Sequence, residues 1–165
     1  MSKPRIRIYG YMPGDLRKHF RKAIEYYANQ LMTPQLVRNL KIQLYYQDVL
    51  NDKTSLGECE VLGSEKKPRR FNITIKPMKN SLKNRIDMFS TLAHEMIHVK
   101  QYAYSQLRFM DNCSQKTKWN GRSINERLYE YENLPWEKEA FLGEDRLFVK
   151  YVDETRSYDY FFGKP

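Results

Sequence analysis

Hydrophobic residues recur at helical spacing in three parts of the chain, and each part begins at a residue type that favours helix starts. The first part follows Asp15 and ends at Thr33 and Pro34. The second runs from Ser81 through Leu107, and the third begins at Pro135. The apolar stripe of the third part is Trp136, Ala140, Gly143 and Leu147. The sequence therefore predicts three main helices.

Alternating apolar and polar residues between the first two helices predict β-strands. The clearest alternation covers residues 40–46 and 71–76, and Pro77 ends the second of these stretches. Residues 58–62 alternate more weakly. Strands and helices in this order predict an α/β (α+β) fold.

The 165 residues (19.9 kDa) fit one domain, 1–165, with a core at about 15–150. Residues 151–165 are rich in aromatic side chains, so this tail either docks on the body or frays. A docked tail is also a candidate for a segment that blocks an active site.

A formal net charge of +9 indicates a surface that attracts anions. The densest basic run is Lys66, Lys67, Arg69 and Arg70, in a predicted turn between two strands. Such a run favours a solvated turn, and weak nucleic-acid association is the alternative.

Cysteine usage and the N-terminus both favour a cytoplasmic protein. Cys59 and Cys113 form no CxxC pair or disulfide framework, so reduced thiols are expected, and neither is a convincing metal ligand. Residues 1–10 contain no apolar run long enough for a signal peptide. No segment has the roughly 20 apolar residues that span a membrane, so no membrane partner is expected.

The second helix carries the sequence HExxH as His94, Glu95 and His98. Residues four apart lie one turn above each other on a helix, so both imidazoles can bind one metal ion, typically Zn²⁺. Glu95 is rotated by about 100° and stands where a general base can reach a metal-bound water. Gln101 faces the same way as His94, which fits either a contact at the site or an exposed helix residue.

A catalytic zinc site needs a third protein ligand, and no histidine follows His98. A carboxylate of the third helix is therefore expected, from Glu137, Glu139 or Glu144. Periodicity places Glu139 and Glu144 equally close to the apolar stripe. Glu137 and Glu139 also suit the first turn of a helix through its dipole.

Three segments, HEMIHVKQ at 94–101, KWNG at 118–121 and NLPWEKEAF at 133–141, resemble a group of small metallopeptidase-like proteins. Many of these are encoded by bacteriophages, and the group is related to minigluzincins. The resemblance implies a zincin-like domain with a twisted, mainly antiparallel sheet on the HExxH helix, flanked by N-terminal and C-terminal helices.

The same resemblance implies zinc on His94, His98 and Glu139, with the glutamate before the alanine as third ligand. It also implies Glu95 as general base and an edge strand, here residues 71–76, that receives a peptide or protein substrate. The separation of 41 residues between His98 and Glu139 is longer than in many gluzincins.

Three hypotheses follow. The first is a zinc-dependent peptidase, and the second is a basic nucleic-acid or nucleoprotein-associated module with a structural or latent zinc site. The third is an enzyme that stays latent until a partner acts or a blocking segment, such as the aromatic tail, is removed.

Overall fold

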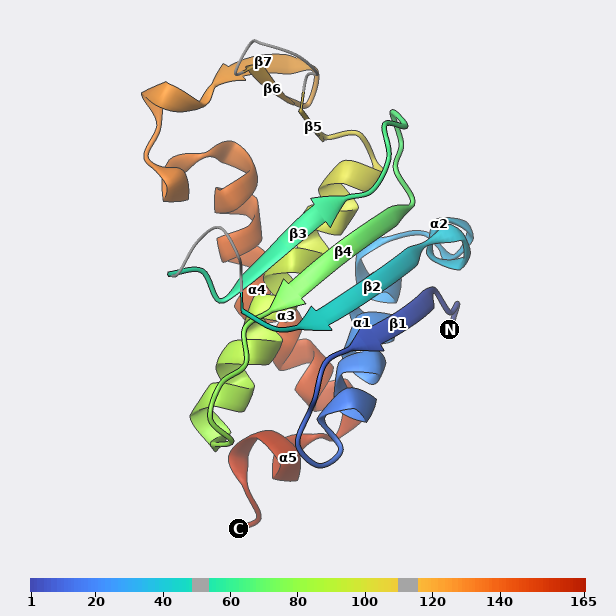
Figure 1. Cartoon of the computed structure of the whole chain (residues 1–165), viewed down its shortest axis with the longest axis vertical. Helices are drawn as coiled ribbons and strands as arrows, with labels where there is room; N and C mark the ends of the chain where they lie inside the picture. Colours follow the sequence, from blue (N-terminus) through green and yellow to red (C-terminus); the bar gives the residue numbers. More distant parts are fainter. Residues whose placement is uncertain (49–53, 110–115) are drawn as a thin grey trace.

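A computed structural model describes residues 1–48, 54–109 and 116–165 of the chain (Figure 1). Cys113, discussed above as a thiol, lies outside the described residues. The expected α/β class is confirmed, since helices and strands both contribute to the packed body.

The main sheet has four strands in the order β1-β2-β4-β3. Their bounds are β1 (Arg5–Tyr9), β2 (Lys41–Tyr46), β3 (Gly57–Val61) and β4 (Arg70–Ile75). The β1–β2 and β2–β4 pairs are parallel, and only β3–β4 is antiparallel. The expectation of a mainly antiparallel sheet on the HExxH helix is therefore wrong. A helical crossover joins β1 to β2, and such connections produce parallel pairs.

β4 is an interior strand, between β2 and β3, so the expectation that residues 71–76 form the edge is also wrong. The weakly alternating segment β3 is the edge strand instead. Backbone bonds join Leu56 to Lys76 and Leu62 to Arg70, which makes Glu58 and Glu60 the residues that bond to β4. The backbone groups of Gly57, Cys59 and Val61 consequently face away from β4.

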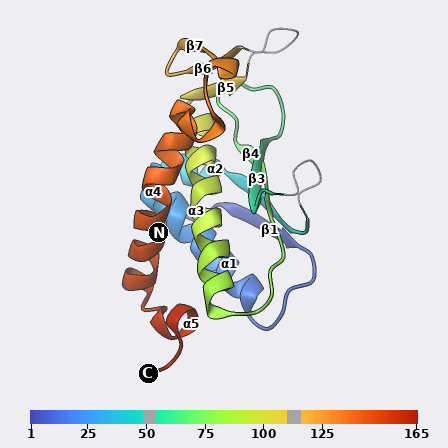
Figure 2. The same cartoon turned by 90° about the vertical axis from the view of Figure 1, so that its left-hand side faces the viewer.

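The helices lie on one face of the main sheet (Figure 2). They are α1 (Leu16–Leu31), α2 (Pro34–Asn39), α3 (Leu82–Ala103), α4 (Pro135–Thr155) and the short α5 (Tyr158–Phe162). Thr33 caps α2 through its side chain, so the pair Thr33–Pro34 both ends one helix and starts another. Across the described ranges, none of the helices has the length and apolar character that crossing a membrane requires.

α3 and α4 pack side by side over much of their length (Figures 1 and 2). Gly143 of α4 allows their close approach, because a Cβ added there would lie 2.8 Å from Ile97 Cδ1. α3 begins at Ser81, whose side chain accepts a bond from Asn84 N–H as a helix cap should, and it ends at Ala103 rather than Leu107.

The connection between α3 and α4 forms a second, antiparallel sheet. Its strands are β5 (Leu107–Phe109), β6 (Lys116–Trp119) and β7 (Arg122–Asn125), followed by the 3-10 turns η1 (Glu126–Leu128) and η2 (Tyr131–Asn133). Asn120 and Gly121 both have positive φ, which is the preferred conformation of a two-residue hairpin turn. Asn120 and Gly121 consequently form the turn between β6 and β7.

The aromatic tail docks on the body. Phe161 of α5 is fully buried against Phe89 of α3 and against Phe148 and Tyr151 of α4. His19 is half-buried because its ring stacks on Tyr160 with the centroids 3.6 Å apart. α5 packs at the start of α3, at the opposite end of the molecule from the second sheet (Figure 1).

Candidate metal centre

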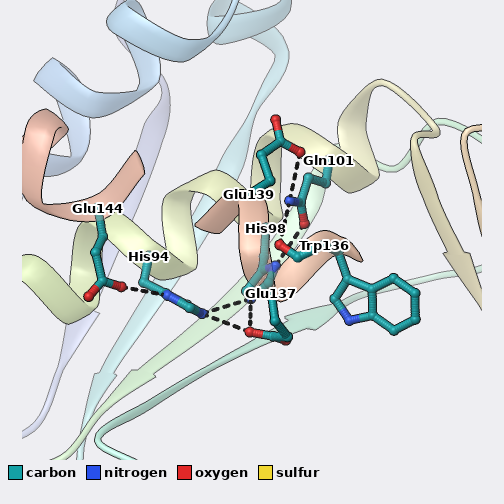
Figure 3. Close-up of polar contacts among 7 residues, drawn as sticks. All are labelled: His94, His98, Gln101, Trp136, Glu137, Glu139 and Glu144. Carbon is teal, nitrogen blue, oxygen red and sulfur yellow. Dashed lines mark hydrogen bonds and ion pairs between the residues drawn. The ribbon is translucent and has the colours of Figure 1, made fainter. Parts of the chain in front are cut away.

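The facing sides of α3 and α4 carry a buried polar cluster (Figure 3). Its members on α3 are His94, His98 and Gln101, and on α4 they are Glu137 and Glu144. On both helices these residues follow helical spacing, so each set lies on one face. His94, His98 and Glu137 are each less than 8% exposed.

Three atoms of this cluster converge on one point. His94 Nε2 lies 3.1 Å from His98 Nε2 and 3.1 Å from Glu137 Oε2. His98 Nε2 lies 3.4 Å from the same carboxylate oxygen. The group His94, His98 and Glu137 is therefore one that could hold a metal ion.

The outer ring nitrogens of both histidines are held by hydrogen bonds. His94 Nδ1–H donates to Glu144 Oε2 over 2.6 Å, and His98 Nδ1–H donates to Gln101 Oε1 over 2.8 Å. Each acceptor fixes a proton on Nδ1, so Nε2 is the nitrogen that each ring presents to the convergence point. Gln101 is fully buried, so of its two alternatives the contact at the site is the one observed.

The structure does not bring Glu139 to the histidines, and Glu137 takes the place expected for it. Glu139 binds Lys100 and accepts a 3.0 Å bond from Gln101 Nε2. It therefore acts on His98 only through Gln101, which also donates to the backbone oxygen of Trp136 over 3.0 Å. Glu144, the other candidate favoured by periodicity, supports His94 from the outer side.

Hydrogen bonds within the cluster shift the pKa values of its members. Burial opposes charge on His94, but the hydrogen bonds to Glu137 and Glu144 outweigh it and raise its pKa to about 10. Burial also opposes charge on His98, but its bond to Glu137 and the negative charges of Glu95 and Glu137 together raise its pKa. Burial opposes the charge of Glu137 as well, yet the bonds from both rings lower its pKa to about 2.

Glu95 lies beside the cluster without joining it. It is 6% exposed, and burial raises its pKa to about 7 against the opposing effect of both histidines. Gly57 of β3 makes room for its carboxyl group, since a Cβ there would lie 3.2 Å from Glu95 Oε1 and 2.6 Å from Thr91 Cγ2. A larger residue at position 57 would displace the acid or the strand.

Two hollows flank the histidines and share Gly57, Glu95 and Tyr131 in their walls. One has a volume of about 310 Å³ and reaches His98 and Glu137. The other, of about 290 Å³, reaches His94 and Glu144. Residues of β3 and α4 line both hollows, which lie next to the candidate metal centre.

The chain matches no protein-family model, no curated protein and no solved structure. Function is therefore inferred from the chemistry of the site itself.

Proposed function

We propose that the protein is a zinc-dependent peptidase, and the convergence of His94, His98 and Glu137 carries this proposal. A tetrahedral zinc with bonds of 2.0–2.1 Å separates its ligand atoms by about 3.3 Å. The three separations here are 3.1, 3.1 and 3.4 Å. Two histidines and one glutamate, with a hollow beside them for a fourth ligand, also match the donor set of catalytic rather than structural zinc.

Bound zinc would polarise a peptide carbonyl and lower the pKa of a water molecule to near 7. Glu95 supplies the matching base, since its own pKa is about 7 and a general base works best when its pKa lies near the working pH. Glu95 would take a proton from water and then pass it to the leaving amine. Its burial excludes competing solvent from this transfer.

β3 offers a place for the substrate backbone. The backbone groups of Gly57, Cys59 and Val61 face away from β4, and β3 ends its sheet. An extended peptide can pair with such an edge strand through main-chain hydrogen bonds. Because Gly57 lines both hollows beside Glu95, a peptide paired there would pass the metal centre.

Two variants test the proposal. Glu95→Gln should bind one equivalent of zinc like the wild type but cleave a peptide library at least about 10²-fold more slowly, because only the base is lost. His94→Ala should lose both zinc and cleavage. Equal turnover by Glu95→Gln and wild type would refute the assigned role.

One observation favours the second function, a nucleic-acid-associated module. Arg5, Lys41 and Arg70 are neighbours in register across β1, β2 and β4, and all three are exposed. Such a row can contact successive phosphates. Salt-dependent binding to single-stranded DNA that Lys41→Glu abolishes, together with no cleavage of any peptide, would favour this function over the first.

A further inference from the structure

The hollow on the His98 side has an apolar wall and an acidic rim. Its apolar part comes from Tyr102 at the end of α3, Phe109 of β5 and Trp136 at the start of α4. Of these, Tyr102 and Trp136 are buried, so their positions are fixed by packing, whereas Phe109 is 62% exposed at the mouth. These walls can enclose the length of one long side chain.

The ionisable groups in this hollow are unusual for so basic a chain. The four acids are Glu58, Glu95, Glu126 and Glu137, and among the described lining residues neither lysine nor arginine occurs. The chain as a whole has 29 lysines and arginines against 20 acids. The local charge is therefore opposite to the charge of the molecule.

Two of the four acids remain for a ligand. Glu137 contacts both histidines, and Glu95 is the proposed base. Glu58 is exposed on the edge strand β3, and Glu126 of η1 accepts a bond from Thr117 Oγ1. These two carboxylates line the hollow from different elements of the fold, and neither contacts the histidines.

We propose that this hollow binds a lysine or arginine side chain of the substrate, next to the bond that is cleaved. The inference rests on the proposed peptidase function. The aliphatic stem would lie against Tyr102 and Trp136 while the charged end reaches Glu58 and Glu126, the usual division of a long basic side chain. Bonds between ammonium or guanidinium groups and carboxylates are among the stronger hydrogen bonds in proteins.

The hollow on the His94 side does not offer the same chemistry. Its acids are Glu95 and Glu144, and Glu144 is already the acceptor for His94 Nδ1–H. Leu56 and Phe141 supply its apolar surface. A basic side chain is therefore selected on one side of the scissile bond only, and its position in cleaved peptides is fixed relative to that bond.

The test compares peptides that differ at one position, with lysine, arginine, norleucine or phenylalanine beside the scissile bond. Norleucine has the apolar stem of lysine without its charge. The zinc-loaded wild type should cleave the basic peptides at least about 10-fold faster than the norleucine peptide, as expected for charged hydrogen bonds. Glu58→Gln combined with Glu126→Gln should reduce that ratio to near one.

Glu60→Gln is the matched control, since Glu60 lies two residues further along β3 and outside this hollow. It removes the same charge and should leave the ratio as in wild type. Glu58→Lys should reverse the selection and favour glutamate at the same position. Cleavage that ignores charge, or a preference that survives the double substitution, overturns the inference while leaving the peptidase function intact.

If no peptide is cleaved although zinc is bound, the proposed function fails, and equilibrium binding then decides the inference alone. Fluorescently labelled peptides should bind wild type more tightly with lysine than with norleucine, and the double variant should lose the difference. Equal binding of both peptides to wild type overturns the pocket assignment as well.

Discussion

Replacing Glu137 by glutamine gives the most direct test of the candidate metal centre. The substitution keeps the size of the side chain but removes the carboxylate that contacts both histidines. The free energy of zinc binding at structural sites is about 10–16 kcal/mol. Divided among four ligands, the loss of one ligand costs about 3–4 kcal/mol. That is a loss of affinity of about 10²- to 10³-fold.

Thermal unfolding with and without zinc measures this loss. At a zinc concentration of about 100 times the wild-type Kd, binding stabilises the fold by about 2.7 kcal/mol. For a domain of this size, each kcal/mol of added stability raises the Tm by about 2–4 °C, so zinc should raise the wild-type Tm by about 5–11 °C. For Glu137→Gln at the same zinc concentration, a 100-fold weaker Kd leaves about 0.4 kcal/mol, or roughly 1 °C.

Glu139→Gln is the matched control, two residues along the same helix. Glu139 contacts Gln101 and Lys100 rather than the histidines, so this substitution should lower the affinity for zinc by about 10-fold at most. If Glu139→Gln abolishes the zinc-dependent rise in Tm while Glu137→Gln retains it, the assignment of the third ligand is refuted.

Three further predictions concern the support of the site. Gln101→Ala removes the acceptor for His98 Nδ1–H and should lower the affinity for zinc by about 10- to 100-fold, measured in competition with a chromophoric chelator. An unchanged affinity would show that Gln101 does not support His98 as a ligand. Zinc must displace the proton that His94 holds with a pKa of about 10, so the affinity for zinc should rise by up to tenfold per pH unit from pH 6 to 9. Calorimetry in buffers of different ionisation enthalpy should detect the released proton. An affinity that does not change with pH would contradict this prediction. Phe161→Ala should destabilise the fold by about 3–5 kcal/mol in urea without changing zinc affinity or cleavage, whereas increased cleavage would restore the tail as a blocking segment.

Local patterns predicted the parts of the site that lie within one helix. His94, Glu95 and His98 occupy successive turns of α3, so their relation follows from helical geometry alone, and the cap at Ser81 marked where that helix begins. The same reasoning failed for strand order. The strong alternation of residues 71–76 arises because one face of β4 is buried under the helices and the other is not, and alternation does not distinguish an interior strand from an edge.

Periodicity favoured Glu139 and Glu144 over Glu137 because the first apolar positions of α4 point away from Glu137. Adding Phe148 and Tyr151, both buried, turns the centre of the apolar stripe by about 20° at 100° per residue. Glu137 then lies about 70° from the centre, and Glu139 lies about 90° away. The stripe of the whole helix therefore ranks Glu137 above Glu139, although Glu144, at about 50°, still lies closer to the centre than either.

The candidate metal centre and the hollow beside it are built from separate pieces of this chain. The candidate metal ligands and the residues that support them all lie on α3 and α4, two long helices packed against each other. Part of the wall of the larger hollow comes instead from the connection between these helices, including Phe109, Glu126 and Leu134. Under the proposed peptidase function, substitutions in that connection would change which peptides are accepted while the geometry of the metal centre is inherited unchanged.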